Sequence, residues 1–221
     1  GYSNIEEKGL SLKRGQNLQV SQIGKSVYSD DYYKSFYTLI LPKYLSKYGT
    51  VNMKSYLGNE NKLQKLEKGD VIFGAEGFGK GRSIVVISDI EKTITNIHGI
   101  TIKQEGEHDL KKGIFVKQIL DFYRNHGIID MMAVGGNGGS FAQKYWDVMK
   151  FPNFPKDKID EITKYYHNEK LNSYNIKNTI DEDFILYDDN YNKDAGIYDL
   201  DLSIKILKKE LRKKIDEMII K

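Results

Sequence analysis

The sequence predicts an α+β fold: a mixed, mainly antiparallel sheet with a few helices, followed by one long C-terminal helix. Two apolar runs rich in β-branched residues, at 70–73 and 82–88, flank a glycine-rich loop, which is typical of two antiparallel strands joined by a wide turn. From Ile197 onward, apolar residues recur at steps of three and four, as on one face of a helix. These observations together indicate a sheet domain with a helical arm.

Length and composition narrow the class of protein. The 221 residues suffice for one sizeable domain, or for one domain with a long appendage. A hydrophobic content of 39% allows a packed core, and a net charge of +3 is by itself only weak support for a nucleic-acid partner. The absence of cysteine excludes disulfide scaffolds and fits a cytoplasmic protein. No apolar run has the length of a membrane span, and because the first residue is Gly1 we expect a processed chain or a piece of a longer one.

The glycine-rich loop FGAEGFGKGRS, residues 73–83, contains the pattern G-x-x-x-x-G-K that opens a nucleotide-binding phosphate loop. Gly81 stands where that motif needs a magnesium-binding Ser or Thr, and a strand follows where the motif needs a helix. An ATP- or GTP-dependent enzyme is therefore the least favoured interpretation. Two others stay open: a plain turn between strands, or a loop whose Lys80 and Arg82 contact the DNA backbone.

The remaining elements follow in chain order. We expect a turn at residues 14–17, an aromatic stretch at 32–48 that Pro42 interrupts, and a single strand over 93–102. Apolar spacing predicts a helix over 114–125, ended by His126 and Gly127. A second glycine cluster at 135–139 predicts an irregular loop, and a short helical stretch follows at 141–149. After the proline connector 151–155, Asp157 is expected to cap a helix from Lys158 to about His167.

The final segment has a narrow apolar stripe on an otherwise charged helix, which favours pairing with a partner helix over burial on its own domain. We expect a recognition domain at residues 1–190 and a dimerisation or spacer helix at 195–221. The seam spaced like a heptad repeat consists of Ile197, Leu200, Ile204, Leu207, Leu211, Ile215 and Met218.

No combination of residues predicts catalysis. The four histidines, at 98, 108, 126 and 167, lack the spacing of a helical zinc pair, and the run Asp188-x-Asn190-x-Asn192 lacks the later glycine and glutamate of a calcium loop. Neither a hydrolase nucleophile elbow nor the cofactor loop and tetrapeptide of an adenine methyltransferase is present. We therefore expect a non-catalytic protein with no metal and no cofactor.

Polar residues in and beside the expected turns are of the types that hydrogen-bond to base edges and bind the DNA phosphates. Arginine can bridge the acceptors of guanine, and asparagine or glutamine can bridge adenine. The candidate DNA-binding residues are Lys13, Arg14, Gln16, Asn17, Lys80, Arg82, Asn137, Ser140, Gln143 and Lys144.

Several segments, in order, resemble the specificity subunits of type I restriction–modification systems. Lys68-Gly69-Asp70-Val71-Ile72-Phe73 resembles the family's strand that opens with Gly-Asp, and Gly139-Ser140 with Gln143 is similar to its Gly-Ser-x-x-Gln segment. The connector at 151–155 and the heptad helix after Ala195 are similar to the family's proline connector and helical spacer. Phe154 and Ile159 stand where the family pattern has proline and glutamine. The resemblance covers residues 60–221.

This resemblance implies a target recognition domain, followed by a spacer helix, that binds double-stranded DNA. It further implies that the protein positions methyltransferase subunits on a DNA half-site for adenine methylation. In larger assemblies a restriction subunit also takes part. One recognition domain and one helix imply either a half-subunit that forms a homodimer or a piece of a longer polypeptide, such as a fused methyltransferase. A protein–protein adaptor that uses only the heptad helix is the alternative outside DNA binding.

Overall fold

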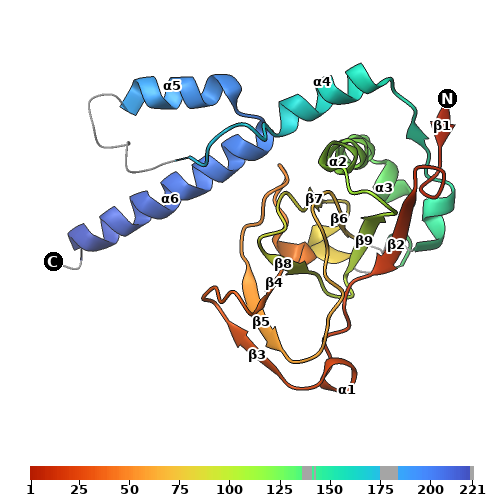
Figure 1. Ribbon diagram of the computed structural model, residues 1–221, viewed down its shortest axis with the longest axis horizontal. Helices are drawn as coiled ribbons and strands as arrows, with labels where there is room; N and C mark the ends of the chain where they lie inside the picture. The colour runs from red at the N-terminus through yellow and green to blue at the C-terminus, as the bar shows by residue number, and fades with distance from the viewer. Residues whose placement is uncertain (136–140, 142, 175–183, 220–221) are drawn as a thin grey trace. The chain divides into compact units, whose positions relative to one another are not determined.

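The computed structural model describes residues 1–135, 141, 143–174 and 184–219, and contacts divide the chain into two compact units, Gly1–Ile159 and Asp160–Lys221. All strands of the described residues lie in the first unit (Figure 1). They are β1 (Tyr2–Ser3), β2 (Leu10–Arg14), β3 (Ser26–Ser29), β4 (Tyr37–Leu39), β5 (Ser55–Asn59), β6 (Val71–Gly74), β7 (Ser83–Val85), β8 (Lys92–Ile94), β9 (Gly99–Gln104) and β10 (Phe151–Pro152).

One four-stranded sheet has the order β2-β9-β6-β7, and every neighbouring pair in it is antiparallel. The central strand β6 is buried along its whole length, as its uniformly apolar run Val71-Ile72-Phe73 requires. The pair β6–β7, joined by the glycine loop, confirms the antiparallel arrangement predicted from the sequence. A phosphate-binding loop of the nucleotide type is thereby contradicted, because the loop leads into a strand and not into a helix.

A second four-stranded sheet has the order β3-β5-β4-β8 and is mixed, because β4 and β8 run parallel while the other pairs are antiparallel. Its apolar face forms a core cluster that includes Leu39, Leu57 and Ile94. A separate core cluster, which includes Leu66, Ile72 and Ile84, contains side chains from β6 and β7 of the first sheet. The two sheets thus have their own cores within one unit.

Helix α2 (Leu110–Asn125) packs on β7 and β6 (Figure 1). The side chain of Asp109 caps it by accepting a hydrogen bond from the backbone N–H of Lys111. The helix therefore begins four residues before the predicted start at 114. It ends as expected, with Gly127 in the left-handed region at φ 73°.

Two other predictions of element boundaries were wrong, whereas the short helical stretch predicted after the second glycine cluster is present. The run 93–102 is not one strand, since a turn at 95–98 separates β8 from β9. The helix expected from Lys158 is α4 (Lys156–Tyr166), so Asp157 lies in its first turn and is not its cap. The stretch after Phe141 forms the short 3-10 helix η3 (Gln143–Asp147). The remaining short helices are α1 (Val20–Ile23), η1 (Pro42–Tyr44), η2 (Gly77–Gly79) and α3 (Ile128–Met131).

The second unit consists of the later part of α4 with α5 (Phe184–Asp194) and α6 (Ile197–Ile219). Asp199, near the start of α6, is 5% exposed and accepts hydrogen bonds from the backbone N–H groups of Asn168 and Gly196. His167 Nδ1 lies 2.7 Å from the same carboxylate. These contacts tie the start of the long helix to the end of α4, within the unit.

The α+β class, the mainly antiparallel sheets and the long C-terminal helix are confirmed. The sequence did not predict α5, and the Asp188-x-Asn190-x-Asn192 run lies within that helix, not in a calcium-binding loop. The boundary between the two compact units lies after Ile159, so most of α4 belongs with α5 and α6. The expected division between a recognition domain at 1–190 and a spacer helix at 195–221 stays a prediction.

Candidate nucleic-acid interface

One end of the β2-β9-β6-β7 sheet brings two of the predicted DNA-binding segments together. Strand β2 ends at Arg14, which pairs with Ile100 near the start of β9. Ile100 also pairs with Phe73 near the end of β6, and Phe73 pairs with Ser83 at the start of β7. The turn after Arg14 and the glycine loop between β6 and β7 therefore leave the sheet at the same end.

The turn after β2 is attached through its backbone to the turn between β8 and β9. The N–H of Gln16 donates to the carbonyl of Thr95 at 2.7 Å, and the N–H of Gly15 donates to that of Gly99 at 2.9 Å. A Cβ at position 15 would lie 2.1 Å from the carbonyl oxygen of Asn96, so only glycine permits this close approach.

The side chains of this turn have defined positions. Lys13 and Arg14 are exposed, and Arg14 Nη1 donates to the carbonyl of Ile97 at 2.9 Å. Gln16 Oε1 accepts from the N–H of Gln64 at 3.1 Å, and Asn17 Oδ1 accepts from the N–H of Gln19 at 3.1 Å. Each of these arginine, glutamine and asparagine side chains therefore has a protein partner and further donors or acceptors for a ligand.

The two basic residues of the glycine loop are held by partners within the protein. Lys80 Nζ lies 2.9 Å from Asp130 Oδ1, and Arg82 Nη1 donates at 2.9 Å to the carbonyl of Leu45. Between them and β6, the ring of Phe78 is 93% exposed. Lys80 and Arg82 thus brace a loop that presents an apolar ring.

The segment after the second glycine cluster returns to the same place. The N–H of Phe141 donates to the carbonyl of Ala75 at 2.7 Å, and the ring of Phe141 meets that of Phe73 edge-on. Lys144 is exposed, with its Nζ 5.1 Å from the centre of the Tyr145 ring, and Gln143 begins η3. Asn137 and Ser140 lie outside the described residues.

A cleft of about 670 Å³, which sequence reasoning missed, lies on the face of this sheet. Its lining includes Lys13 of β2, Lys103 of β9, Lys92 of β8 and Tyr37 of β4, together with the segment 62–67. Five of the lining residues are lysines: Lys13, Lys62, Lys65, Lys92 and Lys103. We call this site the lysine cleft. The only local sequence signal for it is the alternation Thr101, Lys103 on a strand, since both side chains point to one face.

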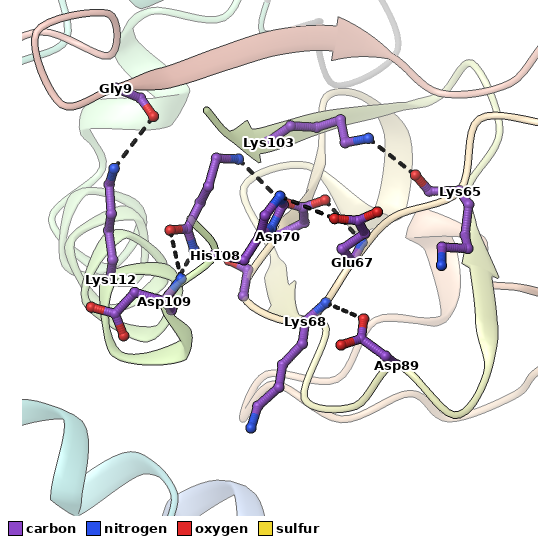
Figure 2. Close-up of polar contacts among 12 residues, drawn as sticks. Gly9, Lys65, Glu67, Lys68, Asp70, Asp89, Lys103, His108, Asp109 and Lys112 are labelled. Atoms are coloured by element: carbon purple, nitrogen blue, oxygen red, sulfur yellow. Dashed lines mark hydrogen bonds and ion pairs between the residues drawn. The ribbon is translucent and has the colours of Figure 1, made fainter. Parts of the chain in front are cut away.

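A polar cluster around the buried Asp70 adjoins the lysine cleft, and Figure 2 shows it beside Lys65 and Lys103. His108 Nε2 lies 3.1 Å from Glu67 Oε2, and its Nδ1 lies 3.3 Å from Oδ1 of the fully buried Asp70. Burial raises the pKa of Asp70, although hydrogen bonds from the backbone N–H groups of Glu67 and Gln104 act in the opposite direction. Among the described residues that line the cleft, Glu67 is the one carboxylate, and it contacts the ring of His108.

The predicted seam of the C-terminal helix is largely accessible to solvent. Leu211 is 61% exposed and Met218 is 76% exposed, and Ile197, Ile204 and Ile215 are also exposed. Leu200 and Leu207 are half-buried. Among the described residues, none therefore buries the large apolar side chains on the outer part of α6.

Other kinds of site are not supported by the described residues. Within them, no group of three or more His, Cys, Asp or Glu side chains is arranged to hold a metal ion. The helices of the described part of the chain are too short or too polar to cross a membrane.

Comparison with known proteins gives a likeness in fold. No family model and no curated protein matches the sequence. One solved structure matches with a TM-score of 0.52 and 11% identity, over 93% of this chain and 44% of that chain. That structure describes the complex assembly and conformational transition of the type I R-M system. The present chain thus shares the fold of a part of that protein and spans less than half its length.

Two further solved structures match at lower scores. The HsdS subunit from Thermoanaerobacter tengcongensis has a TM-score of 0.48 and 11% identity, over 75% of this chain and 36% of its own. The S subunit of a type I restriction-modification system from M. genitalium has a TM-score of 0.47 and 12% identity, over 96% of this chain and 44% of its own.

Proposed function

We propose that the chain is a DNA-recognition module of a restriction–modification system, in which it reads a DNA half-site and positions adenine methyltransferase subunits there. The observation that carries this proposal is the convergence of the Arg14 turn, the Phe78 loop and the chain after the second glycine cluster at one end of one sheet. The shared fold with a chain of a type I R-M system supports the same role.

Recognition of a duplex needs side chains that reach base edges and others that hold the backbone. Arg14, Gln16 and Asn17 provide hydrogen-bonding groups on a turn with a fixed backbone, and Phe78 provides an apolar ring suited to contact a thymine methyl group. The internal partners of Lys80 and Arg82 support a bracing role for these two residues, and their predicted phosphate contact stays a prediction. Catalysis in this proposal belongs to the methyltransferase subunit, so the chain itself needs no cofactor.

The exposed seam of α6 is the surface proposed for assembly. Large apolar side chains such as Leu211 and Met218 are stabilised when a second helix covers them. Its proposed occupant is the corresponding helix of a second copy, or of a second module in a longer polypeptide, with the methyltransferase subunit, and where present a restriction subunit, bound around the pair. The compartment expected for this complex is the cytoplasm.

Selection from a pool of randomised DNA duplexes tests the reading function. The purified chain should enrich a common short sequence and should retain that duplex more tightly than a scrambled one. Arg14→Gln should reduce this preference by about 1–3 kcal/mol, the usual contribution of one bidentate base contact. Lys170→Gln, an equal charge change at an exposed residue of the second unit, is the matched control and should retain the preference.

The adaptor hypothesis gives the opposite pattern. A protein that uses only its C-terminal helix would self-associate or bind a protein partner, but it would neither enrich a sequence nor retain duplex DNA at about 50 mM salt, where phosphate contacts are strong. That combination of results would reject the DNA-recognition proposal.

A further inference from the structure

We infer that the lysine cleft is a binding site for consecutive phosphates of a DNA strand, beside the turn that reads the bases. The inference rests on the proposed function and identifies the surface that holds the backbone. It does not depend on Lys80 or Arg82, because neither residue lines the cleft.

The charge of the cleft calls for an anionic ligand. Within the described residues, none of its five lysines forms an ion pair, and its one carboxylate, Glu67, lies 3.1 Å from a ring nitrogen of His108. Like charges that converge on one cleft repel each other, and the repulsion is relieved when an anion enters.

Two of the ammonium groups are held in place by neutral partners. Lys103 Nζ donates to the carbonyl of Lys65 at 3.1 Å, and Lys92 Nζ donates to that of Ser35 at 3.3 Å. Lys92 Nζ also lies 5.8 Å from the centre of the Tyr37 ring. These contacts restrict the side chains without forming an ion pair, which lowers the entropy cost of binding an anion, although Lys103 also acts on the buried carboxyl of Asp70 through its charge.

The distribution of the lysines favours a strand of phosphates over a single small anion. They come from β2, β8 and β9, hence from both sheets, and from the segment that connects β5 to β6. A compact phosphate ligand is usually held by backbone N–H groups of one glycine loop or helix start. Side chains spread over separate elements instead match a backbone with repeated charges.

The cleft is continuous with the proposed base-reading turn. Lys13, on the wall of the cleft, directly precedes Arg14, and their side chains point to opposite faces of β2. The segment 62–67 is joined to the turn by the hydrogen bond from the N–H of Gln64 to Gln16 Oε1. A strand in the cleft would therefore lie beside Gln64 and Gln16, while Arg14 faces the other side of β2 at the end of that strand.

The salt dependence of DNA binding tests this inference. The variant Lys62→Gln/Lys65→Gln/Lys103→Gln removes three charges from the cleft, and the control Lys150→Gln/Lys164→Gln/Lys170→Gln removes three exposed charges elsewhere. Affinity for a mixed-sequence duplex is measured over a fourfold range of salt. If the cleft holds phosphates, the slope of log affinity against log salt falls in magnitude by about 2.7 in the cleft variant, so the loss of affinity over that range shrinks by about 40-fold. The control slope stays within about one unit of wild type.

The outcomes separate the two proposals. Wild-type protein that does not retain DNA in dilute salt overturns both the proposed function and the cleft. Wild-type protein that binds DNA with a slope unaltered by the cleft variant overturns the cleft alone. Titration with inorganic tripolyphosphate tests whether the cleft instead binds a free phosphate compound. That would be the result if wild type binds tripolyphosphate tightly, the cleft variant does not, and the salt slope of DNA affinity is the same in both. Thermal unfolding of both variants should stay close to wild type, because within the described residues the replaced ammonium groups form no ion pair and the cleft variant loses only the hydrogen bond of Lys103 to the Lys65 carbonyl.

Discussion

The backbone N–H of Gln104 donates a 3.1 Å hydrogen bond to the buried carboxylate of Asp70, which joins the end of β9 to the start of β6. The same carboxylate accepts from the N–H of Glu67 at 3.0 Å, and Gln104 Nε2 donates to the carbonyls of Gly69 and Asp109. These two residues therefore connect both central strands of the sheet to the start of α2. Figure 2 shows how closely this network lies to Lys103 of the lysine cleft.

Replacing Asp70 should destabilise the first unit. Asp70→Ala leaves the buried N–H of Gln104 without its acceptor, which costs about 1–3 kcal/mol in the free energy of unfolding. Urea denaturation measures this loss. Asp89→Ala is the control, because Asp89 is exposed and also accepts from a turn N–H, that of Lys68. An Asp70→Ala variant as stable as this control would show that the network adds nothing to stability.

The ion pair of Lys117 and Asp121 in α2 predicts a pH-dependent stability. Lys117 is 2% exposed, and burial raises the pKa of Asp121, while the charge and hydrogen bond of Lys117 lower it. Lys117→Met removes these opposing effects, so the pKa of Asp121 in the folded state should rise further above its unfolded value of about 3.9. The folded variant then binds more protons than the unfolded chain, and its stability falls as pH rises from about 4.

This prediction is measured by urea denaturation between pH 4 and pH 7. The difference in unfolding free energy between wild type and Lys117→Met should grow with pH and approach the roughly 3–5 kcal/mol typical of a broken buried pair. The double variant Lys117→Met/Asp121→Asn should lose the additional pH dependence. A difference that is constant over this range would contradict the assigned role of Asp121.

Gly113 in α2 should not tolerate alanine, although alanine favours helices. A Cβ at this position would lie 2.1 Å from the carbonyl oxygen of Gly69, which is backbone and cannot rotate away. The gain in helix propensity of about 1 kcal/mol is smaller than the cost of moving the helix from the sheet, about 1–3 kcal/mol or more. Gly113→Ala should therefore unfold at lower urea concentration than wild type, whereas Gln118→Ala in the same helix should alter stability by less than about 0.5 kcal/mol.

The seam of α6 predicts the oligomeric state. Leu211→Asp/Ile215→Asp should abolish self-association or docking to a partner helix, because two charges would enter an apolar interface. Lys209→Ala/Lys213→Ala, which makes the same change in net charge on the same helix, should leave assembly intact. Light scattering reports the mass of each variant. An unaltered mass for the aspartate variant, in a preparation where wild type is oligomeric, would rule out the seam as the interface.

The parts of the fold that were predicted correctly have a local cause. The glycine loop between two β-branched runs and the three-and-four spacing of α6 are properties of short windows of sequence, and both elements formed as expected. The split of residues 93–102 into β8 and β9 was missed because the many β-branched residues of this run outweighed Asn96 and Gly99, which are residue types common in turns. Their role depends on Ile40, whose carbonyl accepts a 2.6 Å hydrogen bond from Thr95 Oγ1 across the fold.

The lysine cleft could not be predicted for a related reason. Lys13 and Lys103 are far apart in sequence and become neighbours only through the pairing of β2 with β9. Each lysine alone is indistinguishable from an ordinary surface residue. The partners of Lys80 and Arg82, Asp130 and the carbonyl of Leu45, were likewise out of reach of any local pattern.

The backbone attachment of the Arg14 turn also bears on how such a protein can change over generations. Gly15 and Gln16 hold the turn through main-chain N–H groups bonded to the carbonyls of Gly99 and Thr95. Since those bonds are common to every amino acid except proline, the side chains on either side can be exchanged while the scaffold persists. Gly15 itself is the fixed point, because a Cβ there would lie 2.1 Å from the carbonyl oxygen of Asn96, so under the proposed function changes of target preference are expected at its neighbours and not at Gly15.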